Sequence, residues 1–381
     1  MRIREITFKD FRCFRGERRI SFVDPATDTV RPVTVLAGSN GSGKTTVLDA
    51  IEALLTLLVD QHNPPDLVNE VLWWGGSICL TVEFSLDDLP DSVWSYNSFK
   101  RDEPEIVTIL IVRAGKTAKI GEIEVPYDPR TEEDFAPFIF AGELDGGRGR
   151  VLIRSQPLRA QVLLQTVSQM VQSKTGLRNG LLYLPHDRRL AVTRGGPIEP
   201  PSQKREWLFR FSPSDEWQGS LEHLWVWQNY LDLEQNAKDR QNLIPFVETV
   251  ETVLGNDRRI RVYQGRVLVP VSWGQGIERP DASLDQLPSG EQQVLLLFGE
   301  LARRRRKGAV IMIDEIENSL HPTLQRLVMW NLRRIAREWD AQVIVATHSL
   351  EVINTVRGGA FINLDYPEDR FDLPVPEQDE E

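Results

Sequence analysis

The chain has 381 residues, 41% of them hydrophobic and 27% charged, a composition typical of a globular protein, with length for one large domain and an insertion or for two domains. Its formal net charge of -11 excludes a surface that is basic throughout. Two cysteines provide no disulfide framework, and no apolar run approaches the roughly 18 residues of a membrane span, so we expect a soluble, cytoplasmic protein with no membrane partner.

The N-terminal elements lead into a glycine-rich loop. Residues 3–14 and 18–23 alternate in polarity like two short strands joined by a turn near Gly16. Residues 33–40 ("VTVLAGSN") form a buried strand that enters the loop, and residues 44–60 have the apolar spacing of a helix. The predicted order is therefore strand, loop, helix.

The loop itself, "GSNGSGKTT", matches the phosphate-binding pattern G-x-x-x-x-G-K-[ST] from Gly38 to Thr45. Its glycines let backbone N–H groups approach phosphate oxygens, and the following helix adds the positive end of its dipole. Lys44 is expected on the β- and γ-phosphates of ATP, and the Thr45 hydroxyl on Mg²⁺. The predicted nucleotide-binding residues of this loop are Ser39, Asn40, Gly41, Ser42, Gly43, Lys44, Thr45 and Thr46.

The rest of the chain alternates strands and helices. Up to residue 273 we expect strands over 77–86 and 105–115, a helix over 155–178, a strand entering a loop over 180–192, an irregular stretch over 194–218, helices over 219–255 interrupted at Pro245, and a hairpin over 259–273. From Leu284 the pattern is βαβ, with a helix over about 290–306, a strand over 309–313, a helix over 322–338 and a strand over 342–346. An acidic, proline-rich and flexible tail is expected over 361–381.

Three polar side chains follow two of the C-terminal strands. Asp314 and Glu315 come directly after "VIMI", and ligands bind at the carboxyl ends of strands in open α/β sheets. Asp314 is expected to hold Mg²⁺, directly or through water, and Glu315 to polarise the attacking water. The pattern recurs in unrelated strands, but the phosphate loop in the same chain favours a catalytic role. His348 ends the next strand and is expected within reach of a γ-phosphate.

The signature segment, residues 284–293 ("LDQLPSGEQQ"), precedes a helix. Ser289 can cap that helix and Gly290 permits close approach of the backbone to an anion, although a capped core helix without a ligand would look the same. Because the phosphate loop already holds its nucleotide from one side, we expect Ser289, Gly290 and Glu291 to contact the nucleotide of a second copy.

These motifs, in this order, resemble the ATP-binding-cassette (ABC) P-loop ATPases, and best their SMC-like, RecF-like and OLD-type branch, which includes AAA-family ATPases of bacterial DNA repair and anti-phage defence. "FKDFRCF" is similar to the "NFR-x-F" start of that branch, which implies Arg12 near the nucleotide, and "DEIENSLHP" resembles the OLD-type "DE-x-E-x-x-LHP". The resemblance implies an α/β P-loop NTPase head with a mixed α/β insertion. It also implies two heads that sandwich two ATP molecules.

The resemblance divides the chain into an N-lobe (1–60), further head strands with an insertion (61–280), a C-lobe with the signature segment and Walker B motif (281–360), and the tail (361–381). No glutamine is evident as the Q-loop residue. "YLPHDRRL" resembles the "P-x-x-RR" element of RecF-like proteins, which makes His186, Asp187 and Arg188 candidates, but a basic surface loop explains it equally well. No TOPRIM-like segment is expected after His348, so for an OLD-like protein the nuclease would be either absent or on another chain.

Local basic stretches are the candidates for DNA contact. "RRRRK" at 303–307 is either a DNA patch or the last turn of a helix, and we favour the helix because cations suit its C-terminal dipole. "GRGRVLIR" (147–154) and "SQKREWLFR" (202–210) either contact DNA phosphates or are solvated loops.

The motifs together predict Mg²⁺-dependent ATP hydrolysis across a head-to-head dimer, coupled to DNA maintenance or anti-phage defence. The insertion would then contact DNA or an effector protein on another chain. One alternative is a slowly hydrolysing, nucleotide-gated scaffold that restrains or activates a separate nuclease or toxin. Another, disfavoured by the signature segment, is the ATPase subunit of a membrane transporter.

Overall fold

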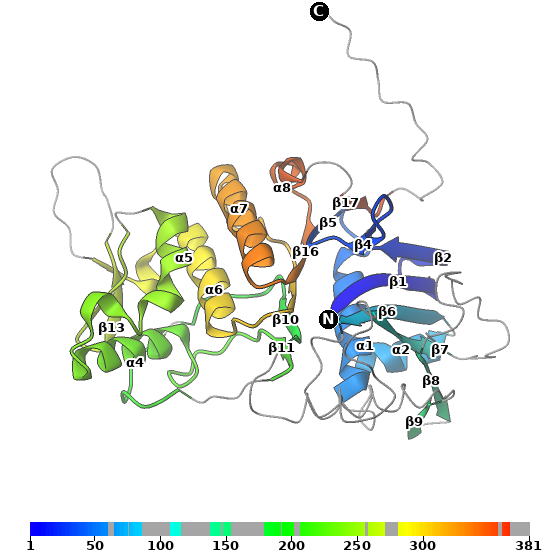
Figure 1. Cartoon of the computed structure of the whole chain (residues 1–381), viewed down its shortest axis with the longest axis horizontal. Helices are drawn as coiled ribbons and strands as arrows, with labels where there is room; N and C mark the ends of the chain where they lie inside the picture. The colour runs from blue at the N-terminus through cyan, green and yellow to red at the C-terminus, as the bar shows by residue number, and fades with distance from the viewer. Residues whose placement is uncertain are drawn as a thin grey trace, which may run out of the picture.

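The computed structural model describes residues 1–59, 65–74, 76–85, 107–115, 138–145, 148–153, 179–191, 193–201, 206–255, 258–270, 281–356 and 360–365. The helix predicted over 155–178 lies outside these residues. The described elements form two six-stranded sheets, with helices between the sheets and on the far side of the second one (Figure 1).

The first sheet is mostly antiparallel and has the order β2-β1-β6-β7-β8-β9. Only β7 and β8 pair in parallel. The predicted N-terminal strands and the strand predicted over 77–86 are all in this sheet. Its strands are β1 (Arg2–Phe11), β2 (Phe14–Ser21), β6 (Ser77–Ser85), β7 (Val107–Gly115), β8 (Phe138–Asp145) and β9 (Arg148–Ile153). A short hairpin of β3 (Val23–Asp24) and β4 (Thr29–Val30) lies beside it.

The second sheet carries the nucleotide motifs. It is parallel throughout, in the order β11-β10-β15-β16-β5-β17. Its strands are β5 (Val33–Ala37), β10 (Leu181–Leu184), β11 (Leu208–Arg210), β15 (Val310–Ile313), β16 (Gln342–Thr347) and β17 (Phe361–Asn363). Because the strands are parallel, the residues that follow β5, β15 and β16 all emerge at one edge.

Both faces of this sheet are buried, which explains its continuous apolar runs. Along β15, Val310 and Met312 pack in the core shared with α1 and the first sheet, and Ile311 and Ile313 pack in the core on the other side. The helices of the first core are α1 (Lys44–Val59) and α2 (Asp66–Trp74). Those beyond the other face include α4 (Leu221–Glu234), α5 (Ile244–Leu254), α6 (Ser289–Arg303), α7 (Pro322–Glu338) and α8 (Leu350–Thr355) (Figure 1).

Smaller elements complete the region around α4 and α6. The predicted hairpin is β12 (Arg261–Tyr263) and β13 (Arg266–Val269), to which β14 (Ala282–Ser283) adds a third strand. Two 3-10 turns, η4 (Lys238–Arg240) and η5 (Leu284–Gln286), precede α5 and α6.

Three predicted boundaries differ from the structure. The stretch predicted as irregular contains β11, which adds to the sheet beside β10. Pro245 does not interrupt a helix but lies in the first turn of α5, where its missing N–H costs no hydrogen bond. The predicted tail begins too early, because β17 pairs with β5 through residues 361–363, and only residues 366–381 lie outside the described part.

The α/β fold class predicted from the sequence is confirmed. Among the helices that the structure describes, none combines the length and the apolar run that crossing a bilayer requires.

Candidate functional site

A pocket of about 400 Å³ opens at the edge where β5, β15 and β16 end. Its volume is in the range of small-molecule sites. It brings together ten of the predicted site residues, Arg12 included, and Cys13, which no motif singled out. The lining residues are Arg12, Cys13, Asn40, Gly41, Gly43, Lys44, Thr45, Thr46, Asp314, Glu315 and His348.

Glycine in the phosphate loop allows the backbone to pass close to neighbouring side chains. Gly43 has a φ of 100°, and a Cβ at this position would lie 2.5 Å from the Phe14 ring and 2.6 Å from Cys13 Sγ. Lys44 Nζ donates to the carbonyl oxygens of Gly38 and Ser39, both at 2.8 Å. Burial lowers the pKa of Lys44 below its usual value. The ammonium group therefore sits inside the curve of the loop, where a phosphate anion would be favourable.

Ser39, the second residue of the phosphate loop, forms hydrogen bonds with a residue of the C-terminal segment. The Ser39 N–H donates to both carboxylate oxygens of Asp365, at 2.9 and 2.8 Å, and the Ser39 hydroxyl donates to Asp365 Oδ1 at 2.7 Å. Among the charges near Lys44, Asp365 acts most strongly to raise the Lys44 pKa against the effect of burial. Asp365 lies in the predicted tail and was not expected at the site.

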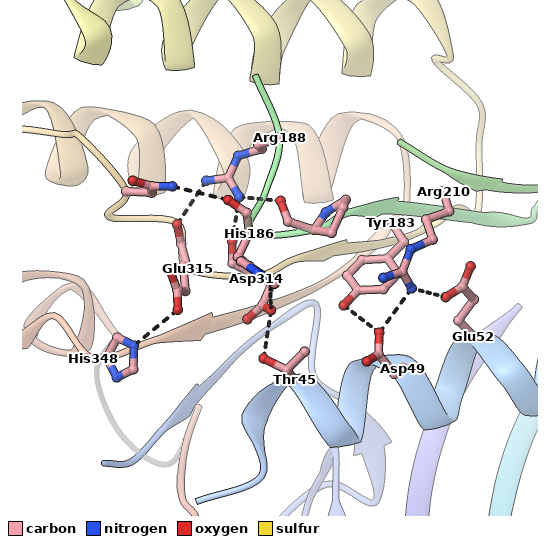
Figure 2. A network of polar contacts seen from close by, with 12 residues as sticks. Thr45, Asp49, Glu52, Tyr183, His186, Arg188, Arg210, Asp314, Glu315 and His348 are labelled. Carbon is pink, nitrogen blue, oxygen red and sulfur yellow. Dashed lines mark hydrogen bonds and ion pairs between the residues drawn. The ribbon is translucent and has the colours of Figure 1, made fainter. Parts of the chain in front are cut away.

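Thr45 and Asp314 form the candidate metal site. The Thr45 hydroxyl donates to Asp314 Oδ2 at 2.8 Å, whereas Asp314 Oδ1 is buried without a hydrogen-bond partner (Figure 2). Burial is the main cause that raises the pKa of Asp314. An orphaned carboxylate oxygen beside a hydroxyl fits a divalent cation such as Mg²⁺. In the described residues no three His, Cys, Asp or Glu side chains converge on a further metal position, so nucleotide phosphates and water would supply the other ligands.

Glu315 and His348 face each other across the pocket. His348 Nε2 lies 3.6 Å from Glu315 Oε1 (Figure 2). Glu315 has a φ of 45°, a left-handed conformation that is unusual for a side chain with a Cβ. The sequence reasoning missed Glu317, whose carboxylate accepts hydrogen bonds from the Thr347 hydroxyl and the His348 N–H. The third acidic residue of "DEIENSLHP" was the available signal.

Arg188 holds the backbone of Asp314 and Glu315 from inside the molecule. Its buried guanidinium donates to the carbonyl oxygens of Pro185, Asp314 and Glu315 (Figure 2). Burial lowers the pKa of Arg188 to about 10. Gln293 of α6 donates to the Arg188 carbonyl at 3.2 Å, so Arg188 is also linked to the helix that follows the signature segment. The interpretation of this segment as a basic surface loop is therefore wrong for Arg188, because its charge is used inside the molecule.

The other two candidates of that segment differ from each other. His186 Nδ1 lies 3.6 Å from Asp314 Oδ2, so the imidazole reaches the candidate metal site. Asp187 is exposed and does not line the pocket.

A second polar network anchors the phosphate-loop helix. Asp49 of α1 accepts from the Tyr183 hydroxyl and from Arg210, each at 3.0 Å, and Arg210 also pairs with Glu52 (Figure 2). The Arg210 guanidinium lies 4.5 Å from the centre of the Tyr183 ring. Asp49, Tyr183 and Arg210 come from three distant parts of the chain, and no sequence signal joined them.

Arg12 lies at the pocket as the resemblance implied, but its guanidinium is engaged. It donates to both oxygens of Glu70 in α2, at 3.0 and 2.7 Å. The hydrogen bond to Glu70 is the main cause that raises the pKa of Arg12. Contact with a nucleotide would require this ion pair to share or release the guanidinium.

The signature segment differs from expectation in its local chemistry. Helix α6 begins at Ser289, and Pro288 holds the cap position without a side-chain hydrogen bond, so the predicted Ser289 cap is wrong. A Cβ on Gly290 would lie 2.8 Å from the Ser319 carbonyl oxygen, so this glycine allows close packing within the chain. Glu291 pairs with Arg258 at 3.0 Å. None of Ser289, Gly290 and Glu291 lines the described pocket.

The run "RRRRK" packs within the molecule more than expected. Only Arg303 belongs to α6, so the predicted helix end at 306 is wrong. Arg304 stacks on Phe209 with its guanidinium 3.4 Å from the ring centre, and Arg306 donates to the Glu206 carbonyl at 2.9 Å. These arginines join α6 to β11. The side chains of 148–153 and residues 202–205 lie outside the described part of the structure.

The comparisons with known proteins agree with this geometry. A family model described as "AAA domain" matches residues 5–244, more than half of the chain. A second model, described as "AAA domain, putative AbiEii toxin, Type IV TA system", matches residues 198–354.

The solved structures that resemble the chain include heads of SMC proteins. One is an SMC head bound to the C-terminal winged-helix domain of ScpA, with 15% sequence identity, coverage of 95% of this chain and 94% of that one, and a TM-score of 0.48. Another is the SMC head domain from Thermotoga maritima, with 16% identity, 95% and 94% coverage, and a TM-score of 0.43. A third is an SMC head with an extended coiled coil, bound to the C-terminal domain of ScpA derived from Pyrococcus furiosus. It has 13% identity, 95% and 93% coverage, and a TM-score of 0.45.

The parallel sheet, the phosphate loop and the Asp-Glu strand end define a P-loop ATPase head. Because the first family model covers more than half of its length, the chain belongs to the AAA-domain family. The predicted P-loop ATPase is confirmed at the level of the AAA-domain family and of the α/β fold.

Proposed function

We propose that this protein is a cytoplasmic ATPase that hydrolyses ATP with Mg²⁺ between two heads and uses the nucleotide state to control DNA maintenance or defence against phage. One observation carries the enzymatic part: Lys44, Thr45, Asp314, Glu315 and His348 line a single pocket. Lysine and threonine suit the phosphates and their metal, and a carboxylate beside an imidazole suits activation of a water.

Within this proposal each residue has one task. Lys44 and the loop amides bind the β- and γ-phosphates. Thr45 and Asp314 hold Mg²⁺, which neutralises charge on the phosphates when bound. Glu315 accepts the proton of the attacking water, and His348 orients the γ-phosphate or the water beside Glu315. Glu317 fixes the backbone of His348, and Arg188 fixes that of Glu315.

The first experiment measures ATP turnover in matched variants. Glu315→Gln keeps the size of the side chain and removes the base, so turnover is expected to fall about 100-fold or more while ATP binding persists. Glu338→Gln, the same change near the end of α7, is the control and should leave turnover within about twofold. Full turnover in Glu315→Gln would remove this residue from the mechanism.

The dimer is supported by the position of the signature segment outside the pocket of its own chain. If the segment completes the partner's site, two inactive variants should complement each other. Lys44→Ala disables the phosphate loop of its own chain, and Ser289→Arg blocks the site of the partner. In a mixed dimer, the intact phosphate loop of one variant meets the intact signature segment of the other, so one of the two sites is complete.

Mixing is therefore expected to restore up to about a quarter of the wild-type turnover, because half of the dimers are mixed and each carries one site of two. A mixture of Lys44→Ala and Glu315→Gln is the control, since both lesions lie on the phosphate-loop side and no intact site forms. No recovery in the first mixture, with both variants folded, would refute a shared site.

A second candidate function is a slowly hydrolysing scaffold that restrains or activates a toxin or nuclease on another chain. A family model whose description names a type IV toxin–antitoxin system matches residues 198–354, and a system with two components supports a function that involves a second chain. Turnover that DNA stimulates would favour the repair function, whereas slow turnover with a stable ATP-bound complex, isolated with its partner from the native host, would favour the scaffold.

A further inference from the structure

His186 reaches the candidate metal site but has no task in the proposed reaction. It follows β10, which pairs in parallel with β15, so it emerges beside Asp314 at the same sheet edge. Its Nδ1 atom lies 3.6 Å from Asp314 Oδ2, the oxygen that accepts the Thr45 hydroxyl at 2.8 Å (Figure 2). A nitrogen, a carboxylate and a hydroxyl therefore lie together, and the carboxylate and the hydroxyl line the pocket.

One oxygen of the carboxylate between them lacks a hydrogen-bond partner. The Asp314 side chain is only 1% exposed, and its Oδ1 atom has no hydrogen bond, whereas Oδ2 accepts from Thr45. A buried carboxylate oxygen without a donor is costly unless a cation compensates it. The unsatisfied oxygen thus points to a ligand that the protein's own side chains do not replace.

We propose that His186 Nδ1, together with Thr45 and Asp314, directly binds the divalent ion that enters with the nucleotide, and that the site favours a first-row transition ion over Mg²⁺. This inference rests on the proposed function and names the ion class for the same site. An imidazole nitrogen is a good ligand for transition ions, whereas Mg²⁺ prefers oxygen.

The separation of the two atoms is compatible with one shared ion. Ligands about 2.1 Å from an ion lie about 3 Å apart in adjacent positions and about 4.2 Å apart in opposite ones. The distance of 3.6 Å between His186 Nδ1 and Asp314 Oδ2 falls between these values.

The turn that carries His186 is held in place on both sides. The His186 carbonyl accepts a hydrogen bond from Asn318 Nδ2 at 3.2 Å, and the preceding Pro185 carbonyl accepts one from Arg188 at 3.0 Å. The His186 side chain itself is 55% exposed. Its backbone is therefore positioned in advance while its imidazole can still adjust to an ion.

His348 supplies a matched control. It lines the pocket beside Thr45 and Asp314, but its Nε2 atom faces Glu315, at 3.6 Å, rather than the Thr45–Asp314 pair. A nitrogen ligand from His348 would place the ion beside Glu315 instead. The two histidines can be separated by substituting one at a time.

The test uses the full chain with Mn²⁺ and a non-hydrolysable ATP analogue, examined by pulsed electron paramagnetic resonance for coupling between the ion and a ligand nitrogen-14 nucleus. We expect imidazole coupling in the wild type and in His348→Ala, and its loss in His186→Ala. Calorimetry adds a second readout, with Co²⁺ or Mg²⁺ supporting binding of the same analogue. His186→Ala should weaken the Co²⁺-supported affinity about tenfold or more and change the Mg²⁺-supported affinity less than about twofold.

Nitrogen coupling that is missing in the wild type, or that survives in His186→Ala and disappears in His348→Ala, would overturn the assignment of His186. Equal losses with Co²⁺ and Mg²⁺ would overturn the selectivity. Failure of the wild type to bind the analogue with any ion would instead reject the proposed nucleotide site. His186→Asn, which keeps a polar side chain of similar reach, should lose the imidazole coupling in the same way.

Discussion

Replacing Arg188 tests whether Asp314 and Glu315, the proposed metal ligand and base, depend on a buried arginine that holds their backbone. Arg188→Met keeps much of the length of the side chain but removes a charged donor from three carbonyl groups, those of Pro185, Asp314 and Glu315. The Pro185 and Glu315 carbonyls still accept from the backbone N–H groups of residues 188 and 318. Hydrogen bonds from a charged donor contribute about 2 kcal/mol each, or roughly 6 kcal/mol together. Removal of the buried charge offsets about 3 kcal/mol of this loss, because burial lowers the pKa of Arg188 to about 10. The expected net loss is about 3 kcal/mol in the free energy of unfolding.

Urea denaturation followed by fluorescence measures this loss. An unchanged dependence of the unfolding free energy on urea concentration would show that the variant unfolds in the same reaction. Turnover should also fall about 10- to 100-fold, because the Glu315 backbone at a φ of 45° loses its fixed partner. Arg189→Met is the matched control. Arg189 is exposed and pairs with Asp215 at 3.1 Å, so its loss should cost less than about 1 kcal/mol. Equal effects of the two substitutions would refute this role of Arg188.

Three further predictions follow from the same site. Asp314→Asn should stabilise the nucleotide-free protein at pH 7 and abolish hydrolysis. Its folded pKa is raised by burial, so Asp314 contributes stability only at low pH and loses it as the pH rises through that pKa. Gly290→Ala should cost about 1–3 kcal/mol in unfolding free energy, because its Cβ would lie 2.8 Å from the Ser319 carbonyl oxygen. Asp365→Asn removes a negative charge near Lys44 while an amide oxygen still accepts from Ser39, so ATP affinity should rise about 3- to 10-fold at low salt.

Each of these has a result that contradicts it. A stability gain for Asp314→Asn that persists below about pH 4, where the wild-type carboxyl is protonated as well, would point to a cause other than ionisation. Unchanged stability of Gly290→Ala combined with weaker nucleotide binding would mean that this glycine approaches an anion after all. Asp340→Asn, which removes a carboxylate paired with Arg2 away from the pocket, is the control for Asp365→Asn. Equal gains in affinity for both would indicate a general charge effect.

The sequence by itself determined the phosphate loop and the acidic strand end. The motif "GSNGSGKTT" can be recognised from local sequence, because a phosphate-binding loop needs its glycines, its lysine and the start of a helix within nine residues. The strand over 310–313 could be predicted because both faces of a parallel strand are buried, which gives a continuous apolar run. The helix over 322–338 could be predicted because one side of a helix is buried, which gives apolar residues at a helical period. These are short-range signals, and the residues that they single out do line one pocket at a single sheet edge.

Only the tertiary structure decided which distant groups support that edge. Arg188 was one basic residue among several until burial and three carbonyl acceptors gave it a role. Asp365, in a segment predicted as a flexible tail, meets Ser39 because β17 pairs with β5. Long-range contacts of this kind depend on strand order, which periodicity along the chain does not encode. Three residues of weak β pattern became a strand because the neighbouring edge was open to pairing.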